Sequence, residues 1–294
     1  MNGLRRGYVK WINPFNRRPT YVSFERTGVI VFWSKNPRPL MPYLSEIDSL
    51  GISYYFQFTL NDYERERLEP RVPPLFERVR TFIELSKMLG KDRVIWRFDP
   101  LILLKEQKAN ELIAKIKGVG DRIHSFTSKL VFSYADIGIY KKVRNNLKRH
   151  NISYQEFDNE KMLEVAEGIA ELCKDWRIKA FTCAERIDLS RFDIHHNKCI
   201  DDELILKIAP EHPSIRRMFR PVNQQNFAFM DKKDPLKDPG QRLECGCVVS
   251  KDIGQYNTCP HLCLYCYANS SETVVLKNYL TASRNKSGLS ITGE

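Results

Sequence analysis

The sequence has no cysteine in its first 172 residues, although it contains eight in 294. Its longest apolar runs, such as residues 29–33 (VIVFW), fall far short of the ~20 residues that a membrane-spanning helix needs. The residues after Met1 lack the apolar stretch of a signal peptide, and the chain has no internal repeat. We therefore predict a cytoplasmic protein without a membrane partner, in a reducing compartment where disulfides are rare.

The composition is that of a globular chain with an excess of positive charge. The hydrophobic fraction is 42% and the charged fraction 28%, while 47 Lys and Arg face 36 Asp and Glu, a net charge of +11. The strongest basic run, residues 141–149, contains five positive charges and no acid. Such a run suits an anionic partner such as nucleic acid, although a solvated helix face is the alternative interpretation.

Short runs rich in β-branched and aromatic residues alternate with segments typical of helices. The expected strands are residues 29–34, 52–59, 93–98, 129–134 and 178–183. The expected helices are about 43–50, 74–89, 107–117, 136–150 and 159–176. Most of the strands are apolar on both faces, as in a parallel sheet that is covered on both sides. The pattern predicts an α/β fold, either a barrel or an open doubly wound sheet.

Polar residues follow each expected strand. They are Lys35 and Asn36; Thr59, Asn61 and Asp62; Arg97 and Asp99; Ser133 and Asp136; and Thr182, Cys183 and Glu185. Any single strand must end in polar turn residues, so no one position carries weight alone. Because α/β folds build their sites at the carboxyl ends of the strands, the five groups together predict a shared site.

The strongest functional signal is the spacing C-x3-C-x2-C of Cys259, Cys263 and Cys266, with the aromatic Tyr265 just before the last cysteine. Three thiolates on one loop can bind three irons of a [4Fe–4S] cluster and leave the fourth iron open to an exogenous chelator. The alternatives are a zinc knuckle or an electron-transfer cluster. Either would need a fourth ligand, for which His261 or the cysteines of the C-x-C at 245–247 are available.

This loop resembles the signature of radical S-adenosylmethionine (SAM) enzymes in both its spacing and its aromatic residue. The resemblance implies that Cys259, Cys263 and Cys266 ligate the cluster and that SAM chelates the open iron. A reductant such as a flavodoxin or ferredoxin would supply the electron. SAM would then be cleaved to methionine and a 5′-deoxyadenosyl radical, which abstracts hydrogen from an unknown substrate.

The order of the motifs is unusual, because the loop of that superfamily commonly follows the first barrel strand. Three segments of this chain also resemble the spore photolyase-like branch: Trp33-Ser34-Lys35-Asn36-Pro37, Phe58-Thr59-Leu60 with Leu68-Glu69-Pro70, and Arg97-Phe98-Asp99-Pro100-Leu101. The resemblance implies a partial (β/α) barrel of radical SAM type. It would be circularly permuted, with the cluster-binding strand and loop at the C-terminus.

The whole chain, over about residues 5–270, resembles an uncharacterised family with this permuted order. Its motifs include Gly7-Tyr8, Thr182-Cys183-Ala184-Glu185, Cys199-Ile200-Asp201 and Cys245-Gly246-Cys247. A Ser-Arg-Arg-Thr-Asp-like segment on a first strand of that family is not found here. We expect residues 1–209 to form the partial barrel, 210–240 an irregular connector rich in proline, 241–270 the cluster-binding segment of the same domain, and 271–294 a mobile tail.

The resemblance also implies roles at the SAM site. Lys35 would pair with the SAM carboxylate, Tyr265 would lie against the adenine, and Glu69 would hold the ribose or the substrate. Arg97 and Asp99 are expected as an ion pair at the pocket mouth. The alternatives are a solvated loop lysine, a packed core tyrosine and a purely structural ion pair.

Four further cysteines, Cys183, Cys199, Cys245 and Cys247, suffice for a second [4Fe–4S] cluster or a zinc site. The alternatives are buried free thiols, or a ligand set in which His195 or His196 replaces Cys199. Cys173 stands in an apolar helical stretch and is expected in the core.

Together these features predict a radical SAM-like iron–sulfur enzyme. Its distant resemblance to a DNA-repair lyase makes nucleic acid a candidate substrate. A non-catalytic nucleic-acid-binding protein with structural zinc is the main alternative. A degenerate fold that binds the cluster but does not cleave SAM is another.

Overall fold

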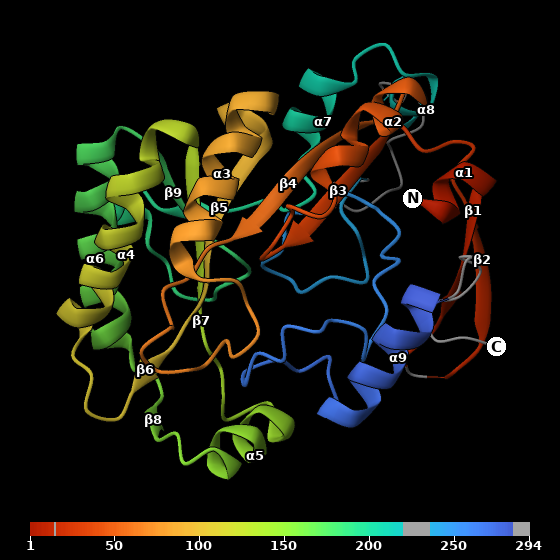
Figure 1. Cartoon of the computed structure of the whole chain (residues 1–294). Helices are drawn as coiled ribbons and strands as arrows, with labels where there is room; N and C mark the ends of the chain where they lie inside the picture. Colours follow the sequence, from red (N-terminus) through yellow and green to blue (C-terminus); the bar gives the residue numbers. More distant parts are fainter. Residues whose placement is uncertain (15, 220–235, 285–294) are drawn as a thin grey trace, which may run out of the picture.

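The computed structural model describes residues 1–14, 16–219 and 236–284. The strands are β1 Tyr8–Ile12, β2 Pro19–Ser23, β3 Val29–Ser34, β4 Ser53–Thr59, β5 Val94–Leu101, β6 Leu103–Leu104, β7 Lys129–Tyr134, β8 Tyr154–Gln155, β9 Lys179–Thr182 and β10 His195–His196. The α-helices are α1 Asn2–Arg6, α2 Leu44–Ser49, α3 Leu75–Leu89, α4 Ala109–Ile123, α5 Lys141–Arg149, α6 Asn159–Trp176, α7 Asp202–Ile208, α8 Pro213–Met218 and α9 Glu272–Arg284. Figure 1 shows their arrangement.

The main sheet of the described residues has six strands in the order β10-β9-β7-β5-β4-β3, and every neighbouring pair is parallel. This order follows the chain from one edge to the other. A doubly wound sheet would instead reverse its direction at a switch point. The prediction of an α/β fold with a parallel sheet is therefore confirmed, and the chain crosses the sheet in a single direction.

Alternation along the strands gives the sheet two different faces. On one face, residues such as Phe56, Trp96 and Phe132 pack in the main core with side chains of α2, α3, α4 and α6. On the other face, Tyr55 and Ile95 pack with apolar residues of α7 and α8. Both faces are covered, and this explains why the strands read as nearly continuous apolar runs.

The second face also carries buried polar residues. Gln57 of β4 is 0% exposed and Arg97 of β5 is 3% exposed. The residues directly before and after each of them in the strand face the main core, so Gln57 and Arg97 themselves point to the opposite face. A buried guanidinium must be paired or it destabilises the fold, so its position indicates a polar site within this face.

The long helix α6 shows how the sequence sets the helical layer. The Asp158 side chain accepts a hydrogen bond from the backbone N–H of Lys161 at 2.9 Å and caps the first turn. At the other end of the helix, Trp176 packs against Gly120 of α4, where an added Cβ would lie 2.0 Å from the indole ring. Only glycine permits this close approach of α4 and α6.

The N-terminal hairpin β1–β2 was not predicted from the sequence, and it holds the segment that precedes the cysteine loop. Trp11 donates its indole N–H to the Gly254 carbonyl at 3.1 Å, and the Gln255 side chain bonds both the N–H and the carbonyl of Ile12. The Lys251 ammonium lies 3.6 Å from the centre of the Trp11 ring. The N-terminal hairpin and residues 251–255 are therefore neighbours in the fold.

The five strands expected from the sequence are β3, β4, β5, β7 and β9, so these predictions are confirmed. One other is wrong, because no strand directly precedes the cysteine loop: residues 249–271 are all described and contain neither helix nor strand. Of the expected mobile tail, residues 272–284 form α9, where Val275 is fully buried, and residues 285–294 lie outside the described residues.

Smaller differences concern boundaries. Helix α4 extends to Ile123, six residues beyond the expected end at 117, and α5 begins only at Lys141. The expected connector 210–240 contains α8, and its residues 220–235 lie outside the described residues. Among the helices that the structure describes, none combines the length and the apolar character needed to cross a membrane.

Candidate functional site

The cysteine loop is fixed to the sheet by its own backbone. The N–H of Leu264 donates to the carbonyl of Leu68 at 2.9 Å, and Leu68 belongs to the segment that follows β4. Within the loop, the N–H of Cys266 donates to the carbonyl of Cys263 at 3.0 Å. The Asn269 amide donates to the Cys259 carbonyl at 3.1 Å and closes the loop from its far side. The loop therefore lies at the carboxyl end of the sheet as a defined turn.

The three loop cysteines differ in exposure: Cys259 is exposed, Cys266 is half-buried and Cys263 is only 8% exposed. Burial raises the pKa of the Cys263 thiol to about 12. Within residues 1–14, 16–219 and 236–284, no three His, Cys, Asp or Glu side chains are grouped as the ligands of one metal ion would be. The thiolates of a cubane cluster bind different irons, so they are spread more widely than the ligands of a single ion.

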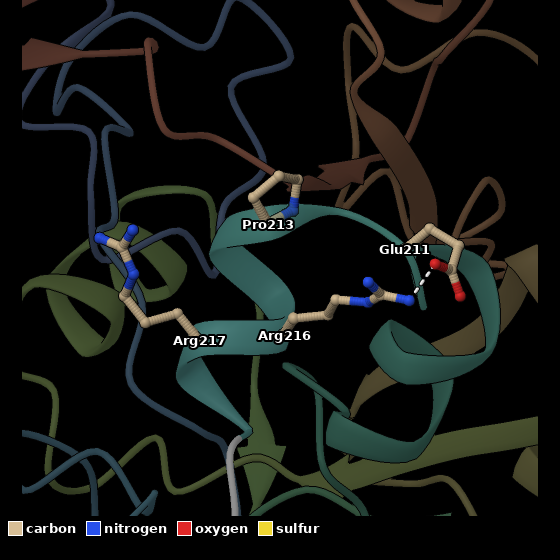
Figure 2. A pocket seen from close by; sticks show the side chains of 4 residues that line it. All are labelled: Glu211, Pro213, Arg216 and Arg217. Carbon is tan, nitrogen blue, oxygen red and sulfur yellow. Dashed lines mark hydrogen bonds and ion pairs between the residues drawn. The ribbon is translucent and has the colours of Figure 1, made fainter.

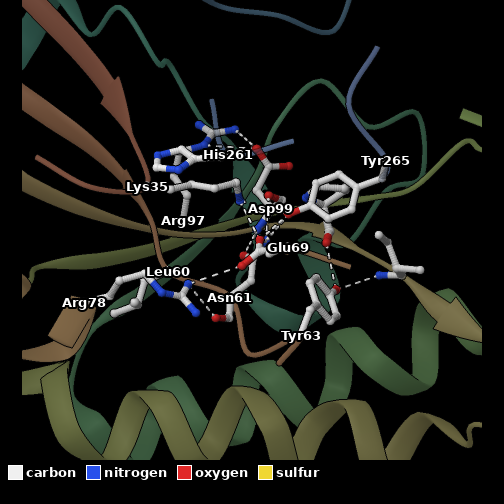
Figure 3. Close-up of polar contacts among 12 residues, drawn as sticks. Lys35, Leu60, Asn61, Tyr63, Glu69, Arg78, Arg97, Asp99, His261 and Tyr265 are labelled. Carbon is white, nitrogen blue, oxygen red and sulfur yellow. Dashed lines mark hydrogen bonds and ion pairs between the residues drawn. The ribbon is translucent and has the colours of Figure 1, made fainter. Parts of the chain in front are cut away.

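Beside the loop lies a group of polar side chains centred on Glu69, which is 8% exposed (Figure 3). Its carboxylate accepts hydrogen bonds from the Lys35 ammonium at 2.8 Å, from the Asn61 amide at 3.2 Å and from the Tyr265 hydroxyl. The Arg78 guanidinium contacts the second carboxylate oxygen at 3.4 Å. Burial alone raises the pKa of Glu69, but the charges of Lys35 and Arg78 outweigh it and hold that pKa below its ordinary value.

Lys35 and Tyr265 link this group to the cysteine loop. The Lys35 side chain is 15% exposed, and its ammonium lies 2.9 Å from the Tyr265 hydroxyl. The Tyr265 ring packs edge to face against Tyr63 at 6.1 Å between centroids, and burial and the charge of Glu69 raise the pKa of its hydroxyl. Lys35 is thus a cation held against Tyr265 of the cysteine loop. The predicted contact of Tyr265 with adenine stays a prediction.

The expected pair of Arg97 and Asp99 forms, with 2.6 Å between the guanidinium and the carboxylate. The Arg97 side chain is only 4% exposed and the Asp99 side chain 22% exposed, so the pair lies mostly inside the fold, and its place at a pocket mouth stays a prediction. The Asp99 carboxylate also accepts a hydrogen bond from the Ser133 hydroxyl, and its backbone N–H donates to the Asn61 side chain at 2.9 Å. Asn61 therefore connects the group around Glu69 with the buried ion pair.

The four remaining cysteines of interest lie together, on the far side of Arg97. They are Cys183 directly after β9, Cys199 after β10, and Cys245 and Cys247 of the C-terminal segment. The sulfurs of Cys183 and Cys199 are 3.6 Å apart, and the Arg97 guanidinium lies 2.9 Å from the Cys199 sulfur. We call this set the four-thiol group.

The structure also separates the other candidate ligands. His195 is exposed and contacts Asp193 at 3.2 Å, while the Nδ1 of His196 lies 3.4 Å from the Thr182 hydroxyl. The Nδ1 of His261 lies 3.1 Å from the Arg71 carbonyl. Cys173 is buried in the main core, as predicted.

Strand-end residues predicted to share a site are joined by these contacts, namely Lys35, Asn61, Arg97, Asp99, Ser133 and Cys183. Glu185 also belongs to this edge, because its carboxylate accepts the Tyr134 N–H at 2.8 Å, and burial raises its pKa to about 7. Sequence reasoning missed Arg78, which is 1% exposed on the inner face of α3. An arginine between Leu75 and Phe82 on that apolar face was the signal.

Two cavities lie elsewhere on the molecule. A cavity of about 330 Å³ at α8 is lined by Glu211, Pro213, Arg216 and Arg217, and the Arg216–Glu211 ion pair crosses it (Figure 2). A larger hollow of about 580 Å³ beside α5 has Lys105, Arg144 and Lys148 in its lining. Neither is lined by the cysteines, so the candidate site is defined by its polar contacts.

Comparison with known proteins gives one family. The family model described as "Domain of unknown function (DUF1848)" matches residues 1–268 of the chain, a span that includes all eight cysteines and the polar residues of the site. No curated protein matches the chain.

Proposed function

The chain belongs to the DUF1848 family, a domain of unknown function, and we propose that it is a radical SAM-like iron–sulfur enzyme on a circularly permuted partial (β/α) barrel. The observation that carries this proposal is the position of the loop of Cys259, Cys263 and Cys266. The loop lies beside the buried group of Lys35 and Glu69, at the carboxyl end of a parallel sheet. That end is where α/β folds place their chemistry.

The strand order supports the barrel part of the proposal. Each strand of the main sheet is added next to the previous one, from β3 to β10. Right-handed crossovers that always advance in one direction place their helices on one face, where α3, α4 and α6 pack in the main core. A (β/α) barrel is built with the same one-directional strand order, which supports this part of the proposal. A permuted order would also explain why a loop from the C-terminal segment contacts residues that follow β3 and β4, the first two strands of the main sheet along the chain.

The donor chemistry of the loop fits a site-differentiated cluster. Its three thiolates are soft ligands suited to iron, and the four-thiol group is held away from it by its own contacts. A [4Fe–4S] cluster bound by three cysteines would supply an electron to SAM at its open iron and so generate the 5′-deoxyadenosyl radical.

The protein's own residues would bind and orient SAM. Lys35 is a cation held in place by Glu69 and Tyr265, and it can accept a carboxylate as a further partner. Glu69 keeps its charge when buried and can in turn accept hydrogen bonds from an amino or hydroxyl group. Tyr63 and Tyr265 form an apolar wall that limits water at this position.

The surroundings of the loop favour an anionic substrate. The basic helix α5 lies directly beside it, since Lys142 donates to the Tyr267 carbonyl at 3.0 Å and Asn146 donates to the Leu264 carbonyl at 3.3 Å. Tyr140 stacks on the exposed Tyr267 at 5.8 Å between centroids. Positive charge interleaved with aromatic rings is the surface on which single-stranded nucleic acids stack and bind.

The test is anaerobic reconstitution with iron and sulfide, followed by dithionite and SAM and an assay for 5′-deoxyadenosine. We expect a brown protein that forms this product. A Cys263→Ala variant should form none, and Cys173→Ala, a cysteine of the main core, serves as the matched control. A brown wild-type protein that leaves SAM intact would favour the degenerate fold. A colourless, zinc-loaded loop would favour the non-catalytic nucleic-acid-binding protein.

A further inference from the structure

The four-thiol group gathers cysteines from three separate parts of the chain. Cys199 is 6%, Cys245 8% and Cys247 5% exposed, and Cys183 is half-buried beside them. Chance rarely brings four thiols into one cluster in a chain with eight cysteines. The group is also distinct from the loop of the proposed radical chemistry, from which the fold separates it by the ion pair of Arg97 and Asp99.

Two of its sulfurs accept hydrogen bonds in the way that thiolates do. The Cys247 sulfur accepts the backbone N–H groups of Cys199 at 3.2 Å and of Ile200 at 3.3 Å. The Cys199 sulfur accepts the Asn197 amide at 3.3 Å and the Arg97 guanidinium at 2.9 Å. Neutral thiols are weak acceptors, whereas several converging donors stabilise negative sulfur.

The backbone that presents Cys199 is itself held firmly. Its carbonyl accepts hydrogen bonds from the Tyr55 hydroxyl at 2.7 Å and from the Gln57 amide at 3.0 Å, both from β4. On the other side, the N–H of Val248 donates to the Ile200 carbonyl at 3.2 Å. Supporting contacts of this kind orient the ligands of metal sites and are part of their design.

From these observations we infer that Cys183, Cys199, Cys245 and Cys247 are the complete ligand set of a second metal centre, a closed four-thiolate site for zinc or an iron–sulfur cluster. Four thiolates, three of them buried, need more positive charge than Arg97 supplies, and the metal provides it. In the described residues the sulfurs do not yet surround one point. The inferred centre requires the cysteine side chains to rotate until the four sulfurs converge, starting from the 3.6 Å between the sulfurs of Cys183 and Cys199.

Such a centre has a defined structural role. It fastens the C-terminal segment, which carries the cysteine loop, to the ends of β9 and β10. The metal therefore stabilises the position of the loop without taking part in its chemistry. The inference does not depend on the proposed function, because a four-cysteine centre would bind metal whether or not SAM is cleaved.

The test uses a full-length variant without the first site, Cys259→Ala/Cys263→Ala/Cys266→Ala. Zinc, iron and acid-labile sulfide are measured in the purified protein, together with its native mass. We expect one centre per chain in this variant. One zinc ion in a colourless protein identifies a zinc site, and about four irons with sulfide in a brown protein identify a second cubane.

The addition of Cys199→Ala should remove this metal, whereas the addition of Cys173→Ala should not. A folded triple variant that carries no stoichiometric metal overturns the inference, as does metal that survives the loss of Cys199. Should the Cys199 variant not fold, the metal content of the triple variant alone decides. Because this variant lacks the first site, its result is separate from any failure of the SAM assay.

Discussion

The two groups of cysteines lie at the same end of the sheet but are built in different ways. The loop takes its three cysteines from a stretch of eight residues, 259–266, and leaves Cys259 exposed. The four-thiol group takes its members from three distant segments and buries three of them. A group that is local in sequence can be recognised from spacing alone, whereas a group assembled by the fold can be recognised only when the strands are in place.

The same difference suggests different roles for the two groups, a reactive role for the cysteine loop and a stabilising role for the four-thiol group. The loop has three thiols and a neighbouring cation, Lys35, so a cubane cluster bound there would keep its fourth iron open to a ligand from solution. In the four-thiol group, backbone N–H groups and Arg97 already occupy the acceptor positions of two sulfurs. An open site is suited to a substrate or cofactor, and a closed site is suited to stability.

The largest effect should follow from loss of a loop thiolate. Cys263→Ala is expected to lower the rate of 5′-deoxyadenosine formation by more than about 100-fold, since even outer partners of metal ligands contribute 10–100-fold. The thermal midpoint should change far less than in a four-thiol variant. The measurements are product by chromatography and unfolding by circular dichroism. Comparable loss of product in Cys173→Ala would contradict a special role for the loop.

The next largest effect should follow from Cys199→Ala. Loss of one ligand leaves the other three thiols and Arg97 without their common partner, so we expect the free energy of unfolding to fall by about 3 kcal/mol or more. For a chain of this size that corresponds to a fall of roughly 6 °C or more in the thermal midpoint. Iron bound by the loop should remain. An unchanged midpoint would show that the four thiols do not fasten the C-terminal segment.

The comparison also explains how much could be predicted. The strands β3 and β7 were predicted residue for residue, because strands covered on both faces are continuous apolar runs. The gathering of polar residues at their ends followed from the parallel arrangement. Which of these residues contact one another could not be predicted. Arg78 contacts Glu69 from a helix, and the periodicity of a helix does not reveal the partner of a buried charge.

The errors have a common physical cause. The strand expected before the cysteine loop was transferred from a resemblance, but residues 249–258 instead bond the hairpin β1–β2 through Trp11 and Gln255. The tail after Ser271 has few apolar residues, yet α9 is held by Asn278, whose amide donates to the Asn257 carbonyl at 3.0 Å. Tertiary contacts determine the conformation of both segments, and these contacts cannot be read from the local amino-acid composition.

A smaller effect should follow from Glu69→Gln. The change leaves Lys35 and the buried Arg78 without their shared carboxylate, so we expect about 2–3 kcal/mol of stability to be lost near neutral pH. The pKa of Glu69 is depressed in the folded chain, so its contribution is present above the ordinary value of about 4.3. It is lost as the pH falls through the folded value. The measurement is unfolding by denaturant as a function of pH.

The matched control is Glu84→Gln, which removes a surface carboxylate paired with Arg38 and Arg80. Its stability should stay close to that of the wild type, because exposed ion pairs contribute little. The gap between the Glu69 variant and the wild type should narrow below about pH 4. A gap that is constant down to pH 2 would mean that the charge of Glu69 does not stabilise the site.

The smallest effect should come from the basic surface beside the loop. Lys148 lines the hollow at α5, and Lys91 is an exposed lysine in the turn before β5. If single-stranded nucleic acid lies along α5, Lys148→Ala should make the slope of log K against log salt less negative by about 0.7, one phosphate contact. Lys91→Ala should leave the slope unchanged, since it precedes the strand at the end away from the loop. Fluorescence anisotropy with a labelled oligonucleotide at several salt concentrations measures both slopes. Equal slopes for the two variants would show that nucleic acid does not bind along α5. They would also remove the main reason to look for the substrate among nucleic acids.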